Sequence, residues 1–128
     1  MKKAKQVIIL RNDLNMRKGK MVAQGAHASL AAIVNLKELK LTLRNLLHNR
    51  EAVISWLINE FTKICVQTKS ETELLALYKL ALKNKLPCSL IKDSGKTEFE
   101  NVPTYTAVAI GPAWEDEINA ITGNLVLL

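Results

Sequence analysis

A lysine, a glutamine and a histidine are spaced in this sequence so that they share one face of a helix. Lys20, Gln24 and His27 fall at about 0°, 40° and 340° when each residue advances by about 100°. Nearly all other positions between Met21 and Ile33 are small or apolar, whereas a surface helix carries a broad polar face. We therefore expect a mostly buried helix whose narrow polar stripe lines a site.

The segment at the start of this helix is basic. Arg17, Lys18 and Lys20 surround Gly19, and a helix N-terminus attracts anions because its first N–H groups have no partner within the helix. The spacing is not that of a Walker A loop, which ends in Gly-Lys-Ser/Thr, since Met21 follows the lysine. Taken singly, the three polar residues of the stripe are better explained as an ordinary first-turn lysine, a surface glutamine and a buried histidine. Together with the basic segment they predict an anion-binding site.

A second polar segment, Asp93 to Thr97, follows an apolar run and reads Asp-Ser-Gly-Lys-Thr. Read as a turn, its Asp and Ser bond their own backbone and its Gly supplies an unusual dihedral angle. If the segment faces the helical stripe, its carboxylate and hydroxyl gain a chemical role. Asp93 would orient Lys20 or polarise a water, and Thr97 would donate a hydrogen bond to an ester or phosphate oxygen. The residues alone leave both readings open.

Predicted strands and helices must hold these two segments in place. Apolar and partly β-branched runs predict strands over residues 6–10, 63–68, 88–91 and 105–110. Apolar residues at helical spacing predict helices over residues 18–36, 37–61 with a break near 48–50, 70–84 and 114–121. We expect Gly111-Pro112 to end the last strand.

The order of these elements, βααβαββα, predicts an α/β fold. We expect a single domain over residues 1–128 with three α/β/α layers and a four-stranded mixed sheet. Ligands bind at the carboxyl ends of the strands in such sheets. The loops at residues 11–20 and 92–97 both leave from such ends and therefore predict one shared site.

Charge and composition narrow the partners and the compartment. The 18 Lys and Arg against 12 Asp and Glu give a net charge of +6, which favours a polyanionic partner. Aromatic residues are only 5%, so phosphates rather than stacked bases would supply most contacts to a nucleic acid. Cys65 and Cys88 lie in apolar runs, which predicts reduced thiols buried in the core of a cytoplasmic protein. The sequence shows no Cys/His cluster with metal-ligand spacing. It also shows no apolar run near its start long enough for a signal peptide or membrane span. We therefore expect no metal, no cofactor and no membrane partner.

Three blocks of the sequence resemble the type II peptidyl-tRNA hydrolases, the archaeal and eukaryotic class. They are Gln6 to Leu14 with Lys18-Gly19-Lys20, Ala23-Gln24 and Ala26-His27-Ala28; Ser89 to Thr97; and Ala109 to Pro112 with Ile121 to Leu125. The resemblance covers the chain except for about residues 34–62. It implies hydrolysis of the ester between a peptide and the 3′ ribose of tRNA, by direct attack of water without a metal, in a homodimer. The substrate would be bound through the phosphates and the 3′ end of the tRNA.

The resemblance also assigns roles to residues. Lys20, Asp93 and Thr97 match the family's catalytic lysine, aspartate and threonine; Lys20 would stabilise charge on the carbonyl oxygen, and the other two would orient the reactants. Further residues would bind the substrate, in part by holding phosphates: Arg11, Asp13, Lys18, Gln24, His27, Ser94, Lys96 and Thr106. The alternative is a noncatalytic tRNA- or protein-binding module on the same fold. Loss of Lys20 or Asp93 would mark that alternative, and both residues are present.

Overall fold

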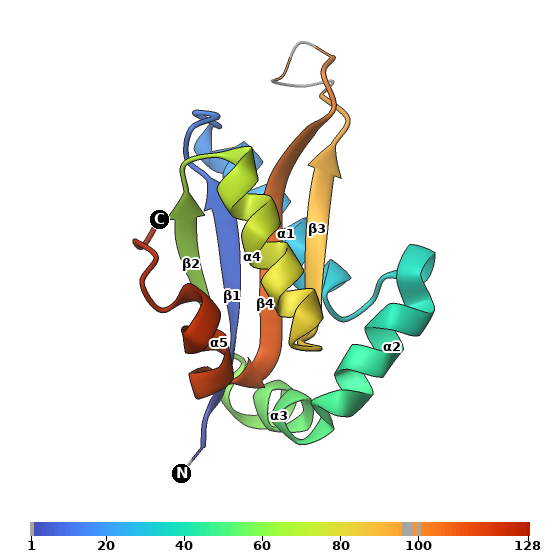
Figure 1. The fold of residues 1–128 in the computed structure, drawn as a ribbon. Coiled ribbons are helices and arrows are strands. Elements are labelled where there is room, and N and C mark those ends of the chain that lie inside the picture. Colours follow the sequence, from blue (N-terminus) through green and yellow to red (C-terminus); the bar gives the residue numbers. More distant parts are fainter. Residues whose placement is uncertain (1, 96–98, 100) are drawn as a thin grey trace.

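A computed structural model describes residues 2–95, 99 and 101–128 and shows a sheet with helices on both faces (Figure 1). Its elements follow one another in this order: β1 (Ala4–Arg11), α1 (Lys18–Ala31), η1 (Leu36–Glu38), α2 (Leu39–His48), α3 (Arg50–Ser55), η2 (Trp56–Glu60), β2 (Lys63–Thr68), α4 (Glu71–Lys83), β3 (Cys88–Asp93), β4 (Thr104–Trp114) and α5 (Glu115–Thr122). Of the two η elements, η1 is a 3₁₀-helix and η2 a π-helix. The predicted α/β class with a four-stranded sheet is confirmed.

The sheet is mixed, with the strand order β2-β1-β4-β3. β1 pairs in parallel with β2, and β4 is antiparallel to both β1 and β3. β1, β2 and β3 therefore run in the same direction, and the segments that follow β1 and β3 leave the sheet at the same end, as the sequence predicted. This end carries the polar residues discussed below.

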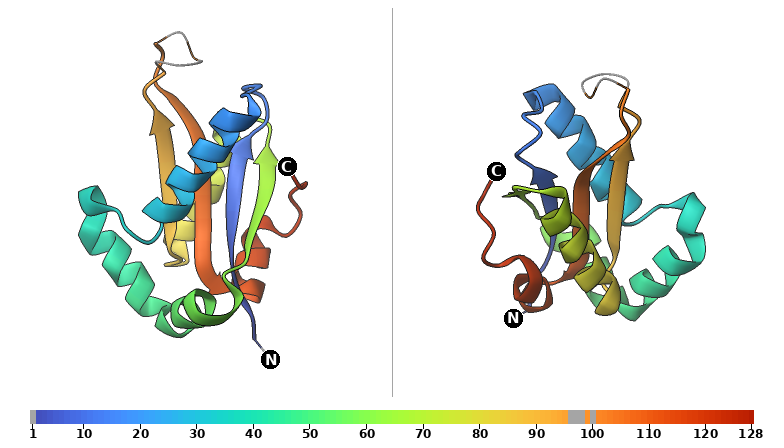
Figure 2. Two further views of the ribbon diagram at one scale, coloured as in Figure 1. Left: turned by 180° about the vertical axis from the view of Figure 1, so that it is seen from behind. Right: turned by 45° about the horizontal axis from the view of Figure 1, so that its top comes forward.

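Helices cover both faces of β1, which is buried along its whole length. Val7 and Ile9 pack with residues of α4 and α5 on one face, and Ile8 and Leu10 pack with Ala28 of α1 on the other. The alternation follows from the strand geometry, in which successive side chains point to opposite faces. An apolar run without polar alternation therefore becomes the central strand of three layers (Figure 2).

Two local signals in the sequence correspond to the ends of helices. The Ser70 hydroxyl accepts a hydrogen bond from the Glu73 N–H at 3.1 Å and so caps the start of α4. The break predicted near residues 48–50 lies at Asn49, between α2 and α3. The Asn49 amide donates to the Lys85 carbonyl at 2.8 Å, which ties this break to the turn after α4.

The prediction that Gly111-Pro112 ends the last strand is wrong, because β4 continues to Trp114. The pairing of β4 with β1 shifts in register between Lys5 and Val7. Pro112 lies opposite this irregularity, where a missing N–H donor costs no regular ladder bond. The Gly111 N–H instead donates to the Pro87 carbonyl at 2.7 Å.

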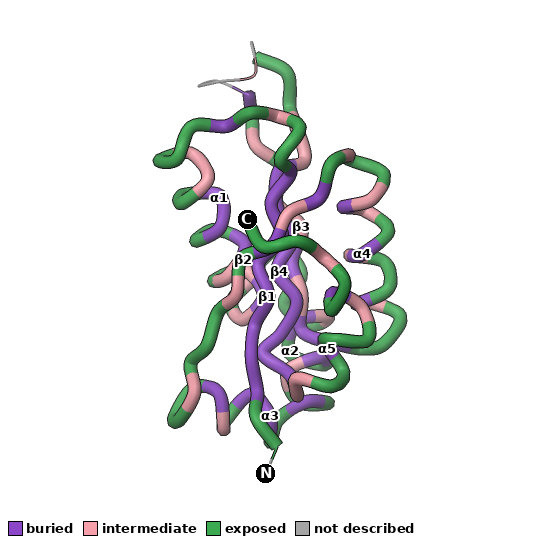
Figure 3. Tube along the Cα trace, turned by 90° about the vertical axis from the view of Figure 1, so that its left-hand side faces the viewer, coloured by how far each residue is buried: buried purple, intermediate pink, exposed green. Residues whose placement is uncertain are grey.

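The prediction of a mostly buried α1 is also wrong. Only Gln24, Gly25 and Ala28 are buried in this helix, while Val22 is 72% and Leu30 63% exposed. The reason is architectural: α1 forms the outer layer on its face of the sheet (Figure 2), so only the side toward the strands is covered. Figure 3 shows the same contrast between buried strands and largely exposed helices.

Candidate active site

Lys20 and Asp93 form an ion pair between the first turn of α1 and the last residue of β3. The distance from Lys20 Nζ to Asp93 Oδ1 is 2.9 Å, and the two side chains are 14% and 12% exposed. A pair at this depth is screened by salt less than a surface pair, yet both groups can still be reached from solvent. The stripe on α1 and the segment after β3 therefore meet in the fold.

Asp93 accepts hydrogen bonds from two further donors. The Gln24 side-chain amide donates to Oδ1 at 3.3 Å and the Gly95 N–H donates to Oδ2 at 2.8 Å. The hydrogen bond from Lys20 is the largest cause that holds the pKa of Asp93 below its usual value. Burial opposes this effect, while Gly95 and Gln24 add to it. Asp93 is therefore a fixed carboxylate at neutral pH.

The orientation of Gln24 is set from β4. The Thr106 hydroxyl donates to Gln24 Oε1 at 2.5 Å, and the two residues are 0% and 3% exposed. Because that oxygen accepts from a hydroxyl, the amide NH₂ points the other way, toward Asp93. Thr106 is thus placed to orient Gln24, and through it the donor that Gln24 offers to Asp93.

Arg11 and Asp13 form a second ion pair, which joins the loop after β1 to β4. Arg11 Nε and Nη2 donate to the two oxygens of Asp13 at 3.1 and 2.6 Å, and Nη1 donates to the Tyr105 carbonyl at 3.1 Å. The bond from Arg11 is the largest cause that lowers the pKa of Asp13. A guanidinium has five N–H donors, so two of those on Arg11 take no part in these bonds.

The remaining predicted site residues that the structure describes make no side-chain hydrogen bond to these clusters. Lys18, His27 and Ser94 are exposed, and the side chains of His27 and Ser94 make no hydrogen bond to another described residue. Lys96 and Thr97 lie outside the described residues. The structure therefore brings together Lys20, Gln24, Asp93 and Thr106 in one cluster, and Arg11 with Asp13 in another.

The sequence did not predict two contacts of this cluster. Gly95 has a φ of +87°, and a Cβ at this position would lie 2.3 Å from the Val102 carbonyl oxygen, so only glycine fits. The turn reading of Asp-Ser-Gly predicted the dihedral angle, but not that the N–H would bind Asp93. The ring of Phe99 lies 5.7 Å from Lys20 Nζ, within the range of a cation–π contact, and no sequence pattern indicated it.

The start of α1 is suited to binding an anion. Arg17 is the N-cap residue, its side chain makes no capping hydrogen bond, and the first turn holds no acidic residue. The N–H groups of the first turn have no partner within the helix, and the helix dipole adds positive potential at this end. Lys18 and Lys20 belong to the same turn. A phosphate therefore has both backbone donors and cations available here.

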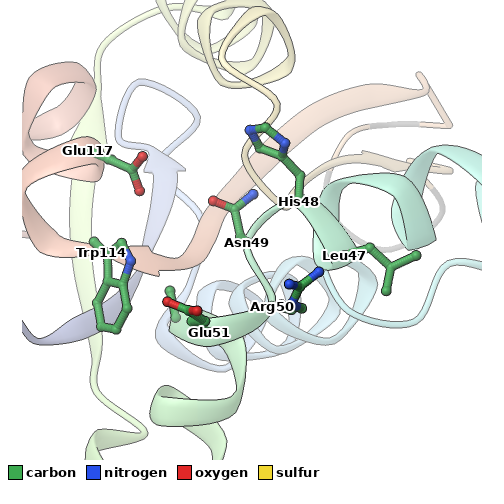
Figure 4. Close-up of a pocket in the computed structure, with 8 residues that line it drawn as sticks. Leu47, His48, Asn49, Arg50, Glu51, Trp114 and Glu117 are labelled. Carbon is green, nitrogen blue, oxygen red and sulfur yellow. The ribbon is translucent and has the colours of Figure 1, made fainter.

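A separate surface pocket lies at the opposite end of the sheet, where β4 ends and β1 begins. It is lined by Leu47, His48, Asn49, Arg50, Glu51, Ala52, Trp114 and Glu117 (Figure 4). Its side chains carry charges of both signs and none belongs to the Lys20 cluster, so we assign it no part in catalysis.

Among the described residues, no group of three or more His, Cys, Asp or Glu is placed to hold a metal ion. No helix in the same part of the chain is long and apolar enough to cross a membrane.

Comparison with known proteins gives one consistent result. The family model described as "Peptidyl-tRNA hydrolase PTH2" matches residues 4–128. A protein of Methanocaldococcus jannaschii named peptidyl-tRNA hydrolase is 45% identical over 124 residues, which cover 97% of this chain and 99% of the relative. Proteins of the same name from Methanopyrus kandleri and Saccharolobus solfataricus are 41% and 40% identical over 124 residues, covering 97% of this chain and 97% and 98% of the relatives. The resemblance found in the sequence is confirmed, and the chain belongs to the peptidyl-tRNA hydrolase PTH2 family.

Proposed function

We propose that this protein hydrolyses the ester that joins a peptide to the 3′ ribose of tRNA. The observation that carries the proposal is the Lys20–Asp93 ion pair, which lies beside a helix start whose first turn holds no acidic residue. Relatives at 40–45% identity are named peptidyl-tRNA hydrolases, which supports the substrate. The basic net charge of +6 favours a polyanion such as tRNA.

In the proposed reaction a water molecule attacks the carbonyl carbon of the ester, and the bond from that carbon to the ribose oxygen breaks. The peptide leaves with a carboxylate, the ribose oxygen takes up one proton of the water, and the second proton is released to solvent. Negative charge builds on the carbonyl oxygen in the transition state, and Lys20 supplies the cation that stabilises it. Asp93 Oδ2 accepts one bond from Gly95 and has a second lone pair with which to orient the water.

The tRNA would be held mainly through its phosphates. Lys18 is exposed in the first turn of α1, where backbone N–H groups also point outward. Arg11 would add a phosphate contact through the two N–H groups not used within the protein, and Asp13 would hold its guanidinium in place. The sequence assigns a further phosphate contact to Lys96 and a hydrogen bond to the ester to Thr97, and both assignments stay predictions.

The other predicted substrate-binding residues divide by burial. Gln24 and Thr106 are buried, so we assign them the positioning of Asp93 rather than contact with the substrate. His27 and Ser94 are exposed and stay predicted contacts to the 3′ end of the tRNA or to the peptide.

Replacement of Lys20 by methionine tests the proposal. We expect the single-turnover rate on N-acetyl-aminoacyl-tRNA to fall about 100- to 1,000-fold, the usual effect of losing one donor to a developing oxyanion. Affinity for tRNA should change far less, since one phosphate contact among several is lost at most. Lys79→Met, at an exposed position of α4, is the matched control. A parallel fall in rate and affinity would make Lys20 a binding residue, and a wild-type protein that releases no amino acid would favour the noncatalytic module.

We further propose a homodimer, as the resemblance implies. Leu39, Leu43 and Leu47 of α2 are 46%, 48% and 65% exposed, whereas Thr42 and Asn45 are buried. This helix therefore turns apolar side chains outward, which is typical of a surface that another chain covers. Sedimentation velocity should show a dimer that the Leu39→Ser, Leu43→Ser double variant dissociates. A wild-type monomer at all concentrations would contradict the proposal.

We also propose that the protein acts in the cytoplasm. Cys65 and Cys88 are free thiols, and Cys65 is exposed rather than buried, contrary to the expectation from its apolar run. An exposed free thiol persists most readily in a reducing compartment. Cell fractionation that placed the protein outside the cytoplasm would refute this assignment.

A further inference from the structure

An apolar pocket lies on the same face of the sheet as α1, between this helix and η2. Its lining residues are Ile8 of β1, three residues of α1, Ile33 just after that helix, Lys63 of β2 and two aromatic rings; the α1 residues are Ala26, Ser29 and Leu30, and the rings are those of Trp56 and Phe61. Leu30 and Phe61 stand at its open side, where they are 63% and 54% exposed. In the view from behind the sheet, α1 crosses the sheet diagonally, and β2 lies to one side of it (Figure 2).

The aromatic rim of the pocket is held in an uncommon conformation. Phe61 has a φ of +52°, which a bulky residue rarely adopts, and its N–H donates to the Trp56 carbonyl at 2.8 Å. The ring centroids of Phe61 and Trp56 are 4.8 Å apart, and Lys63 Nζ lies 3.2 Å from the centroid of the Phe61 ring. These contacts therefore hold Phe61 in a strained backbone conformation in which its ring stays half exposed. Folded proteins retain such backbone strain chiefly at positions that have a function.

The pocket lies within reach of the candidate active site. Ala26 and Leu30 follow Lys20 by six and ten residues on the same helix, which is about 9 and 15 Å along its axis. At about 100° per residue, Ala26 and Leu30 also lie about 120° and 80° around the helix from Lys20, so the peptide must cross the exposed surface of α1. An extended peptide advances about 3.3 Å per residue, and a chain attached at Lys20 reaches the pocket within its third to fifth residues, closer to the fifth. The start of α1, where phosphates would bind, points in the opposite direction along the axis.

We infer that this pocket is a subsite for an apolar side chain of the substrate's peptide, at the third to fifth residue counted back from the ester. The inference rests on the proposed function, which places the ester at Lys20. A peptide joined to that ester is tethered, so its side chains meet a pocket at this reach at a high effective concentration. Aliphatic and aromatic walls favour side chains such as leucine or phenylalanine over glycine or charged residues.

A substrate series tests the inference on the full-length protein. The substrates are tRNAs that carry acetylated hexapeptides, all glycine except for one leucine placed from the second to the sixth residue. We expect kcat/KM to peak when leucine is at the third to fifth residue, about five- to tenfold above the all-glycine substrate, as partial burial of one leucine provides. Leu30→Ser and Phe61→Asn should each reduce this ratio to within about twofold of one. Asparagine is chosen because it tolerates the positive φ at this position.

Leu127→Ser is the matched control, since Leu127 is 67% exposed and pairs with Val66 of β2; it should keep the leucine preference. Equal hydrolysis of the leucine and glycine series by the wild-type protein would overturn the inference. So would a preference that survives both pocket variants. Hydrolysis of N-acetyl-aminoacyl-tRNA by the wild-type protein separates the two proposals. Its absence refutes the proposed function, and its presence without a leucine preference refutes only the subsite.

Discussion

Substitution of Thr106 by valine isolates the role of one buried hydroxyl. Thr106 is fully buried and donates its only hydroxyl proton to Gln24 Oε1, while the Gln24 amide donates to Asp93. Valine keeps the branched shape but cannot donate a hydrogen bond. The change therefore leaves the packing of β4 nearly intact and removes the group that orients Gln24.

The expected magnitude follows from what is left unpaired. Gln24 is 3% exposed, so water does not replace the lost donor, and a buried acceptor without a partner costs about 1–3 kcal/mol of unfolding free energy. Rotation of the amide does not relieve this, since it would turn the oxygen toward the Asp93 carboxylate. Asp93 keeps Lys20 and Gly95 as donors but is less firmly positioned. A loss of about 1–2 kcal/mol in the transition state corresponds to a rate about 5- to 30-fold lower.

Two measurements check this prediction: urea unfolding and the single-turnover rate on N-acetyl-aminoacyl-tRNA. Thr106→Ser keeps the hydroxyl and should retain most of the rate. Thr122→Val removes another buried threonine hydroxyl, one that donates to the Ile118 carbonyl within α5, and should not change the rate. Wild-type stability and rate in Thr106→Val would refute the orientation of Gln24 by Thr106. Equal damage from serine and valine would show that the methyl group, not the hydroxyl, matters.

Three further perturbations follow from the same geometry. Gly95→Ala should lower the hydrolysis rate about tenfold or more and destabilise the fold by about 1–3 kcal/mol, because the alanine Cβ would collide with the Val102 carbonyl. Gly19→Ala is the control: a Cβ at that position has no heavy atom within 4 Å, so urea unfolding should show no loss of stability. The pKa of Asp93 is lowered below 3.8, so its stabilising effect is complete above about pH 4 and is lost as the pH falls further. Between about pH 5 and pH 2.5, Asp93→Asn should therefore lose less unfolding free energy than wild type. Affinity for tRNA should fall with salt at a logarithmic slope of about −0.7 to −0.9 per phosphate contact, and a flat titration would exclude binding led by phosphates.

Local sequence signals were sufficient to predict most of the fold. The unbroken apolar run of β1 predicted a strand covered on both faces, and Ser70 with Glu73 predicted the start of α4. The parallel direction of β1 and β3 then followed from the order of elements. That direction was enough to predict that Lys20 and Asp93 share one end of the sheet.

The features that the sequence did not predict depend on contacts between distant residues. The link from Thr106 to Gln24 spans 82 residues, and no periodicity shows which polar side chains will meet across a sheet. The continuation of β4 beyond Pro112 depends on a register shift in its partner strand, which leaves no trace in the sequence of β4. The Gly95 N–H acts through backbone geometry, and residue types report on such geometry only indirectly.

The small residues of α1 have a different explanation from the one that the sequence suggested. Complete burial does not account for them, because half of the helix is open to solvent. A Cβ on Gly25 would lie 3.5 Å from Ile8 Cγ2, and Ala28 is 0% exposed against the same face of the sheet, so small side chains bring the helix axis close to the strands. At this short distance Gln24 reaches Thr106 on β4 and Lys20 reaches Asp93 on β3. A larger residue at the buried positions would raise the helix from the sheet and separate these pairs, so the composition of α1 determines the geometry of the site rather than the extent of the core.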